Sequence, residues 1–261
     1  MALAAQELRA PLSTVMTMAD RLFPLISEQS NEEAEDQVAR INRGLYQMLR
    51  IISNMSDAYR YTQGMPTRFE IRDICSILDE VFLESAPLIQ HTGMDLHFEN
   101  LNERVFGLVD AEKLERAVHN ILSNALKFTT AGSKIDARLT RRKNMLYLTV
   151  QNSCAHASAT APAHFYKQYL RKPGLGDSRF GIGLGMVLIH SAAAAHGGTV
   201  LLETTPENCT RITMSIAIRQ SNDPQLRASI IQVDYAGERD HRLVELSDSL
   251  SADLYRKNKI N

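Results

Sequence analysis

The stretch NILSNALKFT, residues 120–129, decides the fold class that this sequence predicts. Its apolar residues recur every three or four positions, which is the spacing of one helix face. Asn120, Asn124 and Lys127 follow the same spacing, so their side chains project from one side of the expected helix. Carboxamide oxygens suit Mg²⁺, and a lysine neutralises a phosphate oxygen. The stretch therefore indicates a magnesium-phosphate site, although paired Asn residues by themselves are also common on solvated helix faces.

A second glycine-rich stretch, GIGLG at residues 181–185, leads into an apolar helix that ends at Gly197 and Gly198. Glycines at a helix N-terminus leave backbone N–H groups open to an anion at the positive end of the helix dipole. A dinucleotide-binding turn is disfavoured because polar residues precede the glycines and the spacing is GxGxG, and the Walker lysine is absent. The stretch predicts a phosphate-binding turn or, alternatively, a loop whose glycines serve only mobility.

Strand and helix patterns alternate around these two stretches. Period-two apolar alternation predicts half-buried strands at residues 96–98, 135–139, 146–150 and 212–218. Helical spacing predicts helices at about residues 72–90, 111–128 and 184–196. The strands at 134–140 and 145–151 follow each other closely enough to form a hairpin. We therefore expect an α/β sandwich with a mixed sheet and helices on one face.

The beginning of the chain predicts two amphipathic helices instead. Apolar residues recur at spacings of four and three over residues 8–26 and 38–59, and Ser30 with Glu33 forms a capping box between them. Two such helices make an antiparallel hairpin, and a second copy would cover its exposed flank in a dimeric four-helix bundle. The alternative is a hairpin that packs only on its own chain. The whole chain is thus of the α+β class.

Gly64 and Pro66 mark the change of pattern, so we expect a helical domain at residues 1–64 and an α/β domain at 65–218. Residues 219–261 are a tail with one expected short helix and no assigned role. A formal net charge of −1 gives no overall attraction to nucleic acid or to an anionic membrane. The three cysteines lack metal-ligand spacing, and no run reaches the roughly 20 apolar residues of a membrane span. We expect a cytoplasmic chain.

The order and spacing of these motifs resemble the sensor histidine kinases, whose ATP-binding domain is of the GHKL ATPase type shared with gyrase and MutL. NILSNALKFT is similar to the family's N box, FYKQYLRKP stands where its F box is expected, and GIGLG with AHGG is similar to its G2 box. The resemblance covers about residues 69–218 and implies ATP and Mg²⁺ as cofactors, with Asn124 as the magnesium ligand. The implied nucleotide-binding residues are Asn120, Asn124, Lys127, Asn152, Gly181, Gly183, Leu184 and Gly185.

The resemblance also implies a lid at residues 155–180. Its basic residues either reach the phosphates or are merely solvated; they are Lys167, Arg171, Lys172 and Arg179. The family's G1 box is altered, because Asn152 replaces the Asp that accepts a hydrogen bond from the adenine amino group. Cys154 and His156 take its glycine places. Asn152 still accepts through its carbonyl oxygen without charge assistance, so we expect weak adenine binding.

AAQELRAPLS, residues 4–13, resembles the family's H box, in which a phosphoacceptor His precedes Glu, Leu, Arg, a variable residue and Pro. Pro11 removes a helix hydrogen bond and is expected to bend the helix beside position 6. The resemblance makes Glu7 the base and Arg9 an organiser of the approach. Position 6 is Gln, whose amide nitrogen has a delocalised lone pair and is not a useful nucleophile. We therefore expect no autophosphorylation at Gln6.

The resemblance implies the catalytic core of a two-component kinase, a homodimer that passes a phosphoryl group from Mg-ATP to a His and then to a response regulator receiver domain. It also implies a preceding sensor region that anchors the full-length parent in the bacterial inner or plasma membrane. The alternative is a non-enzymatic docking module, which Gln6 and the altered G1 box favour. A gyrase-type ATPase is disfavoured, because Asn120 stands where those enzymes carry a Glu as general base.

Overall fold

The computed structural model describes residues 2–27, 32–62, 67–129, 132–152, 184–204, 209–219 and 239–256. The chain divides into two compact units, which we describe separately. Unit 1 contains residues 1–64 and 233–261, and unit 2 contains residues 65–232. The last residues of the chain therefore belong with the first helices.

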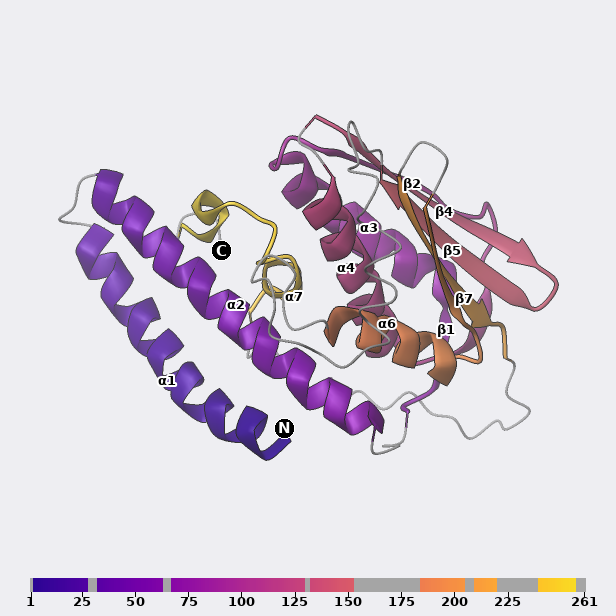
Figure 1. The fold of residues 1–261 in the computed structure, drawn as a ribbon, viewed down its shortest axis with the longest axis horizontal. Helices are drawn as coiled ribbons and strands as arrows, with labels where there is room; N and C mark the ends of the chain where they lie inside the picture. The colour runs from indigo at the N-terminus through magenta and orange to yellow at the C-terminus, as the bar shows by residue number, and fades with distance from the viewer. Residues whose placement is uncertain are drawn as a thin grey trace. The chain divides into compact units, whose positions relative to one another are not determined.

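Unit 1 is built on two long helices, α1 (Ala2–Ser27) and α2 (Glu32–Thr62), which lie side by side as the predicted antiparallel hairpin (Figure 1). The guanidinium Nη2 of Arg9 donates to Ser53 Oγ at 3.4 Å and joins the two helices. The first turn of α2 is acidic and its last turn contains Arg60, and both charges favour the helix dipole. Within the described residues, no helix combines the length and the apolar character of a membrane span.

Each helix of the hairpin has a buried inner apolar stripe and an exposed outer apolar stripe. The inner stripe of α1 is buried and consists of Leu12, Met16, Ala19 and Phe23. The outer stripe is exposed and consists of Leu8, Val15, Met18 and Leu22 on α1 and Ile41, Met48 and Tyr59 on α2. Spacings of three and four are met by both of two neighbouring flanks of a helix, so only the packing separates the two stripes.

The C-terminal segment, residues 239–256, forms α7 (His241–Glu245) and the 3₁₀ helix η2 (Ala252–Tyr255), and both pack on α2 (Figure 1). Asn42 Nδ2 donates to the carbonyl of Tyr255 at 3.0 Å, and the rings of Tyr46 and Tyr255 meet edge to face. The Tyr255 hydroxyl donates to the Leu243 carbonyl at 2.7 Å. Burial raises the pKa of Tyr255. The short helix expected here is present, and the segment has a packing role that the sequence analysis did not assign.

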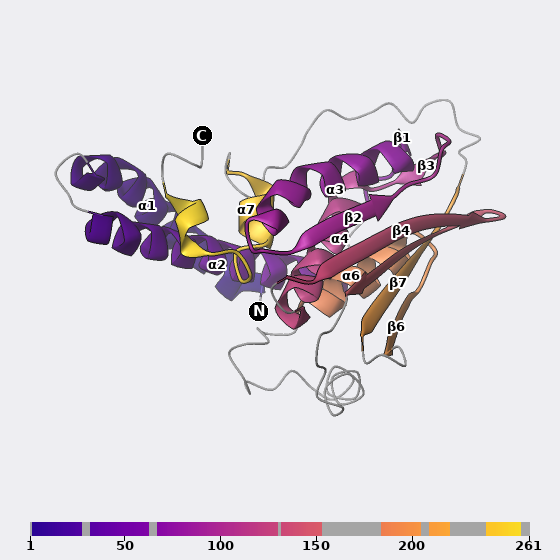
Figure 2. The same ribbon diagram turned by 90° about the horizontal axis from the view of Figure 1, so that it is seen from above.

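Unit 2 contains a five-stranded mixed sheet with helices on one face (Figure 2). In spatial order the strands are β2 (Asp95–Glu99), β4 (Lys134–Arg142), β5 (Met145–Asn152), β7 (Thr210–Ala217) and β6 (Val200–Thr204). The β2–β4 pair is parallel and the other pairs are antiparallel, including the predicted β4–β5 hairpin. The covering helices are α3 (Ile74–Gln90), α4 (Ala111–Phe128) and α6 (Leu184–Ala195).

A separate two-stranded sheet pairs β1 (Glu70–Asp73) with β3 (Phe106–Val109). These two four-residue strands were not predicted, because such short segments show too little alternation to be distinguished from loops. In β5 the alternation is complete: Leu146, Leu148, Val150 and Asn152 are buried, and the residues between them are half-buried. Since α4 packs on β5, the buried row faces the helix layer.

Candidate functional site

Helix α4 carries three of the predicted site residues. It begins at an N-cap, where Asp110 Oδ1 accepts a hydrogen bond from the backbone N–H of Lys113 at 3.1 Å. Its packed face is apolar and consists of Leu114, Ala117, Val118, Ile121, Leu122 and Ala125. Asn120 is buried beside this face, whereas Asn124 and Lys127 are half-buried. The cap and the apolar face therefore hold the two carboxamides and the lysine on one side of the helix.

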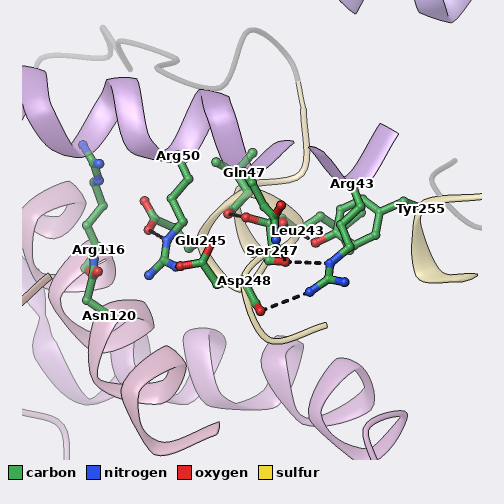
Figure 3. A network of polar contacts seen from close by, with 11 residues as sticks. Arg43, Gln47, Arg50, Arg116, Asn120, Leu243, Glu245, Ser247, Asp248 and Tyr255 are labelled. Carbon is green, nitrogen blue, oxygen red and sulfur yellow. Dashed lines mark hydrogen bonds and ion pairs between the residues drawn. The ribbon is translucent and has the colours of Figure 1, made fainter. Parts of the chain in front are cut away.

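Asn120 lies against Gly185, the second residue of α6. Asn120 Nδ2 donates to the carbonyl of Arg116 one turn earlier at 2.8 Å, which orients the carboxamide along its own helix (Figure 3). A Cβ at position 185 would lie 2.9 Å from Asn120 Oδ1, so this approach requires glycine. Two motifs that are distant in the sequence are thus brought together, with the N-terminal turn of α6 beside an α4 carboxamide.

Asn124 contacts the same turn of α6. Its Nδ2 lies 3.7 Å from the sulfur of Met186, a weak hydrogen bond. The carboxamide oxygen is at the other end of this group and is the atom that a hard cation would bind. The carboxamides of Asn120 and Asn124 therefore both meet the beginning of α6, as a shared phosphate-and-metal site requires.

The orientation of α6 is determined at its other end. Gly197 has a positive φ of 69°, and its backbone N–H donates to the carbonyl of Ala194. The backbone N–H of Gly198 donates to the carbonyl of Ala193 at 2.8 Å, and these two hydrogen bonds form a Schellman motif. At Gly198 a Cβ would overlap the carbonyl oxygen of Ser215 on β7, so only glycine fits. The AHGG sequence therefore ends the helix and seats it on the sheet.

A buried histidine joins α6 to the start of α4. His196 Nε2 accepts from the backbone N–H of Asp110 at 3.0 Å, and His196 Nδ1 lies 2.7 Å from the carbonyl of Ala192. A backbone N–H only donates and a carbonyl only accepts, so the ring is neutral and carries its proton on Nδ1. Burial lowers the pKa of His196, which favours this neutral form. Because Asp110 also caps α4, one cluster positions both helices of the site.

Asn152, the predicted contact of the nucleobase, is the last residue of β5 and is 2% exposed. Its Oδ1 accepts a hydrogen bond from the backbone N–H of Thr210 on β7 at 3.1 Å. The oxygen that the sequence analysis reserved for an adenine amino group therefore already has a partner within the sheet.

The predicted acceptor residues lie on α1 in unit 1. Gln6 is within this helix, Glu7 is exposed, and Arg9 is half-buried with its guanidinium directed to Ser53. The helix continues on both sides of Pro11. The bend beside position 6 stays a prediction.

Several predicted features lie outside the described residues. They are Gly181, Gly183, Cys154, His156 and the lid at 155–180 with its basic residues. Four residues that orient the described part of the site were not predicted from the sequence, namely Asp110, His196, Met186 and Thr210. Asp110 could have been recognised from the sequence as an N-cap, because it directly precedes a helical pattern. His196 could have been recognised from its place beside the glycines that end a helix. Met186 and Thr210 could not have been recognised, because their contacts with Asn124 and Asn152 depend on the tertiary fold.

Two domain families match successive parts of the chain. Residues 1–64 match the His Kinase A (phospho-acceptor) domain, and residues 109–220 match the histidine kinase-, DNA gyrase B-, and HSP90-like ATPase family. A phosphoacceptor hairpin followed by an ATPase of this type defines the class of two-component histidine kinase cores. The chain belongs to the sensor histidine kinases, as its motifs predicted.

Curated relatives are similar over both parts. Sensor histidine kinase RppB of Synechocystis is 27% identical over 219 residues, which cover 82% of this chain and 48% of that protein. Sensor histidine kinase CusS of Escherichia coli K12 is 27% identical over 218 residues, which cover 81% of this chain and 44% of that protein. The chain thus spans less than half the length of these two relatives.

Solved structures have the same fold. Full-length ShkA in complex with AMPPNP has a TM-score of 0.65 at 19% identity, and the match covers 84% of this chain and 46% of ShkA. Histidine kinase AdeS of Acinetobacter baumannii has a TM-score of 0.53 at 15% identity, and the match covers 82% of this chain and 98% of AdeS. The predicted α+β class, with a helical hairpin and a GHKL-type sandwich, is confirmed.

Proposed function

We propose that unit 2 binds Mg-ATP and that the chain is a histidine kinase core whose own acceptor position is inert. The observation that carries this proposal is the approach of Asn120 to Gly185. It joins two kinds of group that a metal-bound triphosphate needs. The α4 carboxamides supply neutral oxygens for a hard cation, and the start of α6 supplies backbone N–H groups at the positive end of a helix dipole.

In this proposal Asn124 holds Mg²⁺ through its carboxamide oxygen, while Asn120 and Lys127 line the phosphate side. Leu184 and Gly185 contribute the first turn of α6, and Gly181 and Gly183 precede it in the chain. The magnesium ion, when bound, neutralises phosphate charge. Lys127 adds a further positive charge near the end of α4.

The acceptor helix retains part of the family arrangement without its nucleophile. Glu7 is exposed where the family has its base, and Arg9 is attached to α2 through Ser53. The amide nitrogen of Gln6 does not attack phosphorus, because its lone pair is delocalised into the carbonyl. We propose that phosphoryl transfer to a His, and onward to a response regulator Asp, does not begin at this position.

The outer apolar stripe of unit 1 supports a homodimer. The exposed side chains of Leu8, Val15, Met18 and Leu22 repeat along α1, and α2 extends the stripe with Ile41 and Met48. A second copy that presents the same stripe would bury both in a four-helix bundle. A receiver domain would then dock on the helices near Gln6. In the full-length parent we propose a membrane-anchored sensor region ahead of α1.

The second candidate function is a dimeric docking module without kinase chemistry. Gln6 favours this function, because it is not a nucleophile. The hydrogen bond from the backbone N–H of Thr210 to Asn152 Oδ1 also favours it, because this oxygen was expected to accept from the adenine amino group. A titration of the chain with nucleotide separates the two candidates.

The experiment is calorimetric titration of the chain with AMPPNP, with and without Mg²⁺. The proposal expects magnesium-dependent binding that is lost in Asn124→Ala and kept in the exposed control Asn102→Ala. Gln6→His would then restore autophosphorylation from ATP. Absence of binding at millimolar nucleotide would reject the kinase pocket and favour the docking module.

A further inference from the structure

Residues 67–69 are the first described residues of unit 2 and follow the hairpin closely in the chain. The Lys113 ammonium donates to Thr67 Oγ1 at 2.8 Å, and the backbone N–H of Arg68 donates to Asp110 Oδ2 at 3.1 Å. Asp110 is the N-cap of α4, and Lys113 lies in its first turn. The stretch that enters unit 2 is therefore attached to the beginning of α4.

Phe69 attaches the same stretch to the end of α6. Its ring meets the ring of His196 edge to face, with the two centroids 5.6 Å apart and the planes at 86°. Arg219 lies over the Phe69 ring, with Cζ 6.0 Å from the ring centroid, and Arg219 Nη1 donates to the carbonyl of Ala195 at 3.5 Å. One aromatic side chain thus contacts both groups that hold the C-terminal end of α6.

Helix α6 connects this attachment with the proposed nucleotide site. Its N-terminal turn contains Gly185, which lies against Asn120, and His196 directly follows its last residue. Twelve residues at about 1.5 Å per residue make α6 about 18 Å long. A tilt of about 3° at the His196 end therefore displaces Gly185 by roughly 1 Å. Such a displacement is large for a contact at which an added Cβ would already lie 2.9 Å from Asn120 Oδ1.

We infer that Phe69 is a positioning residue of the nucleotide site and acts on it through His196 and α6. This inference rests on the proposed function, because it concerns the affinity of that site for Mg-nucleotide. Removal of the Phe69 ring leaves every residue of α4 and α6 unchanged, so an effect on the site must pass through these contacts. The affinity for nucleotide therefore depends on how the stretch that follows the hairpin is seated on unit 2.

The test is calorimetric titration of the chain with AMPPNP and Mg²⁺ after substitution of Phe69. Phe69→Ala should weaken binding about fivefold, which is the scale of one aromatic pair. Phe69→Leu keeps an apolar side chain without the ring contact and should also weaken binding, so it decides the question if Phe69→Ala does not fold. Phe69→Tyr keeps the ring and should bind as tightly as the wild type.

The matched control is Phe98→Ala. Phe98 on β2 is half-buried like Phe69, and its ring stacks on Phe82 of α3 with the centroids 4.0 Å apart. This variant also removes an aromatic pair from unit 2, but the pair lies on elements that do not carry the site. It should therefore keep the wild-type affinity.

A double-mutant cycle separates positioning from a general loss of stability. Gly185→Ala already disturbs the approach to Asn120, so adding Phe69→Ala should weaken binding little further. Additive losses would overturn the inference, and so would wild-type affinity in the Ala and Leu variants of Phe69 or an equal loss in Phe98→Ala. Each of these results leaves the nucleotide site itself intact. If the wild-type chain binds no nucleotide, the proposed function fails and the inference fails with it.

Discussion

Arg50 of α2 and Glu245 of α7 form a buried ion pair, with Arg50 Nε 3.4 Å from Glu245 Oε2, although 195 positions separate them in the chain. Arg50 Nη1 also lies 2.5 Å from Asp248 Oδ2. Arg43 donates to the carbonyls of Ser247 and Asp248 beside this pair (Figure 3). The C-terminal segment therefore supplies the countercharges of a buried arginine and is an integral part of the hairpin unit.

The first prediction concerns this ion pair. Glu245→Ala removes the more deeply buried of the two countercharges of Arg50, so it should destabilise unit 1 by up to about 3–5 kcal/mol. Hydrogen exchange at the amides of α2 and α7 measures this loss without interference from unit 2. Replacing both partners, as in Arg50→Met with Glu245→Leu, should recover most of it.

The matched control for that ion pair is Asp36→Ala, which breaks the solvent-exposed pair between Arg40 and Asp36. Exposed pairs contribute little, so the loss should be below about 1 kcal/mol. An equal effect of Glu245→Ala and Asp36→Ala would mean that the C-terminal segment is only loosely attached.

The second prediction concerns pH and His196. Burial lowers the pKa of this ring, while in the unfolded chain a histidine takes up a proton near about pH 6.5. The stability that comes from neutral His196 is therefore full above that pH and is lost as the pH falls below it, at up to about 1.4 kcal/mol per pH unit. Protonation would turn Nε2 into a donor that faces the Asp110 N–H.

Urea unfolding of unit 2 between pH 5 and pH 8 tests this expectation. His196→Gln should flatten the acid side of the profile, and the exposed control His97→Gln should not. Charged groups near the ring are Asp110, Lys113 and Arg219. A profile that His196→Gln leaves unchanged would contradict the neutral, doubly bonded histidine.

The third prediction concerns Glu115 on α4, whose contribution to stability should fall, rather than rise, as the pH increases. Burial first, and then the nearby carboxylate of Glu80, raises the pKa of Glu115 to about 7. Its neutral form stabilises the fold at low pH, and this contribution is lost as the pH rises from about 4.3 towards 7. Glu115→Gln should therefore stabilise unit 2 at pH 8 by roughly 2 kcal/mol and have little effect at pH 4. Denaturation midpoints at the two pH values measure the difference.

The fourth prediction concerns Gly185. A methyl group there would press on Asn120 Oδ1, and Asn120 cannot turn away without breaking its bond to the Arg116 carbonyl. Gly185→Ala should lower the affinity for Mg-nucleotide about tenfold, which corresponds to about 1.4 kcal/mol. Gly44→Ala on α2 is the control, since its Cβ would meet no atom within 4 Å. Similar nucleotide affinity in both variants would remove the structural basis of the site.

The fifth prediction concerns the outer stripe. Met18→Glu places a charge in the middle of the exposed apolar residues of α1 and should convert a dimer into a monomer in sedimentation experiments. Leu83→Glu changes a still more exposed apolar residue, on α3 in unit 2, and should leave the mass unchanged. A dimer that survives Met18→Glu would place the interface elsewhere.

The sequence by itself determined the longer helices and strands of this protein and their order. Apolar periods of 3.6 and 2 arise within single helices and strands, so the hairpin helices and the strands β4 and β5 were predictable. Asn120, Asn124 and the glycine turn were likewise visible as local motifs. These features depend on neighbouring residues, which the linear sequence displays directly.

Only the tertiary structure decided which of these groups meet. The same spacing suits both stripes of α1, and only packing separates Leu12 inside from Val15 outside. Likewise, the linear pattern does not show that Glu245 neutralises Arg50 or that Thr210 engages the Asn152 oxygen. Burial makes such distant contacts decisive, because a charge or carboxamide removed from water must find its partner wherever the fold brings one.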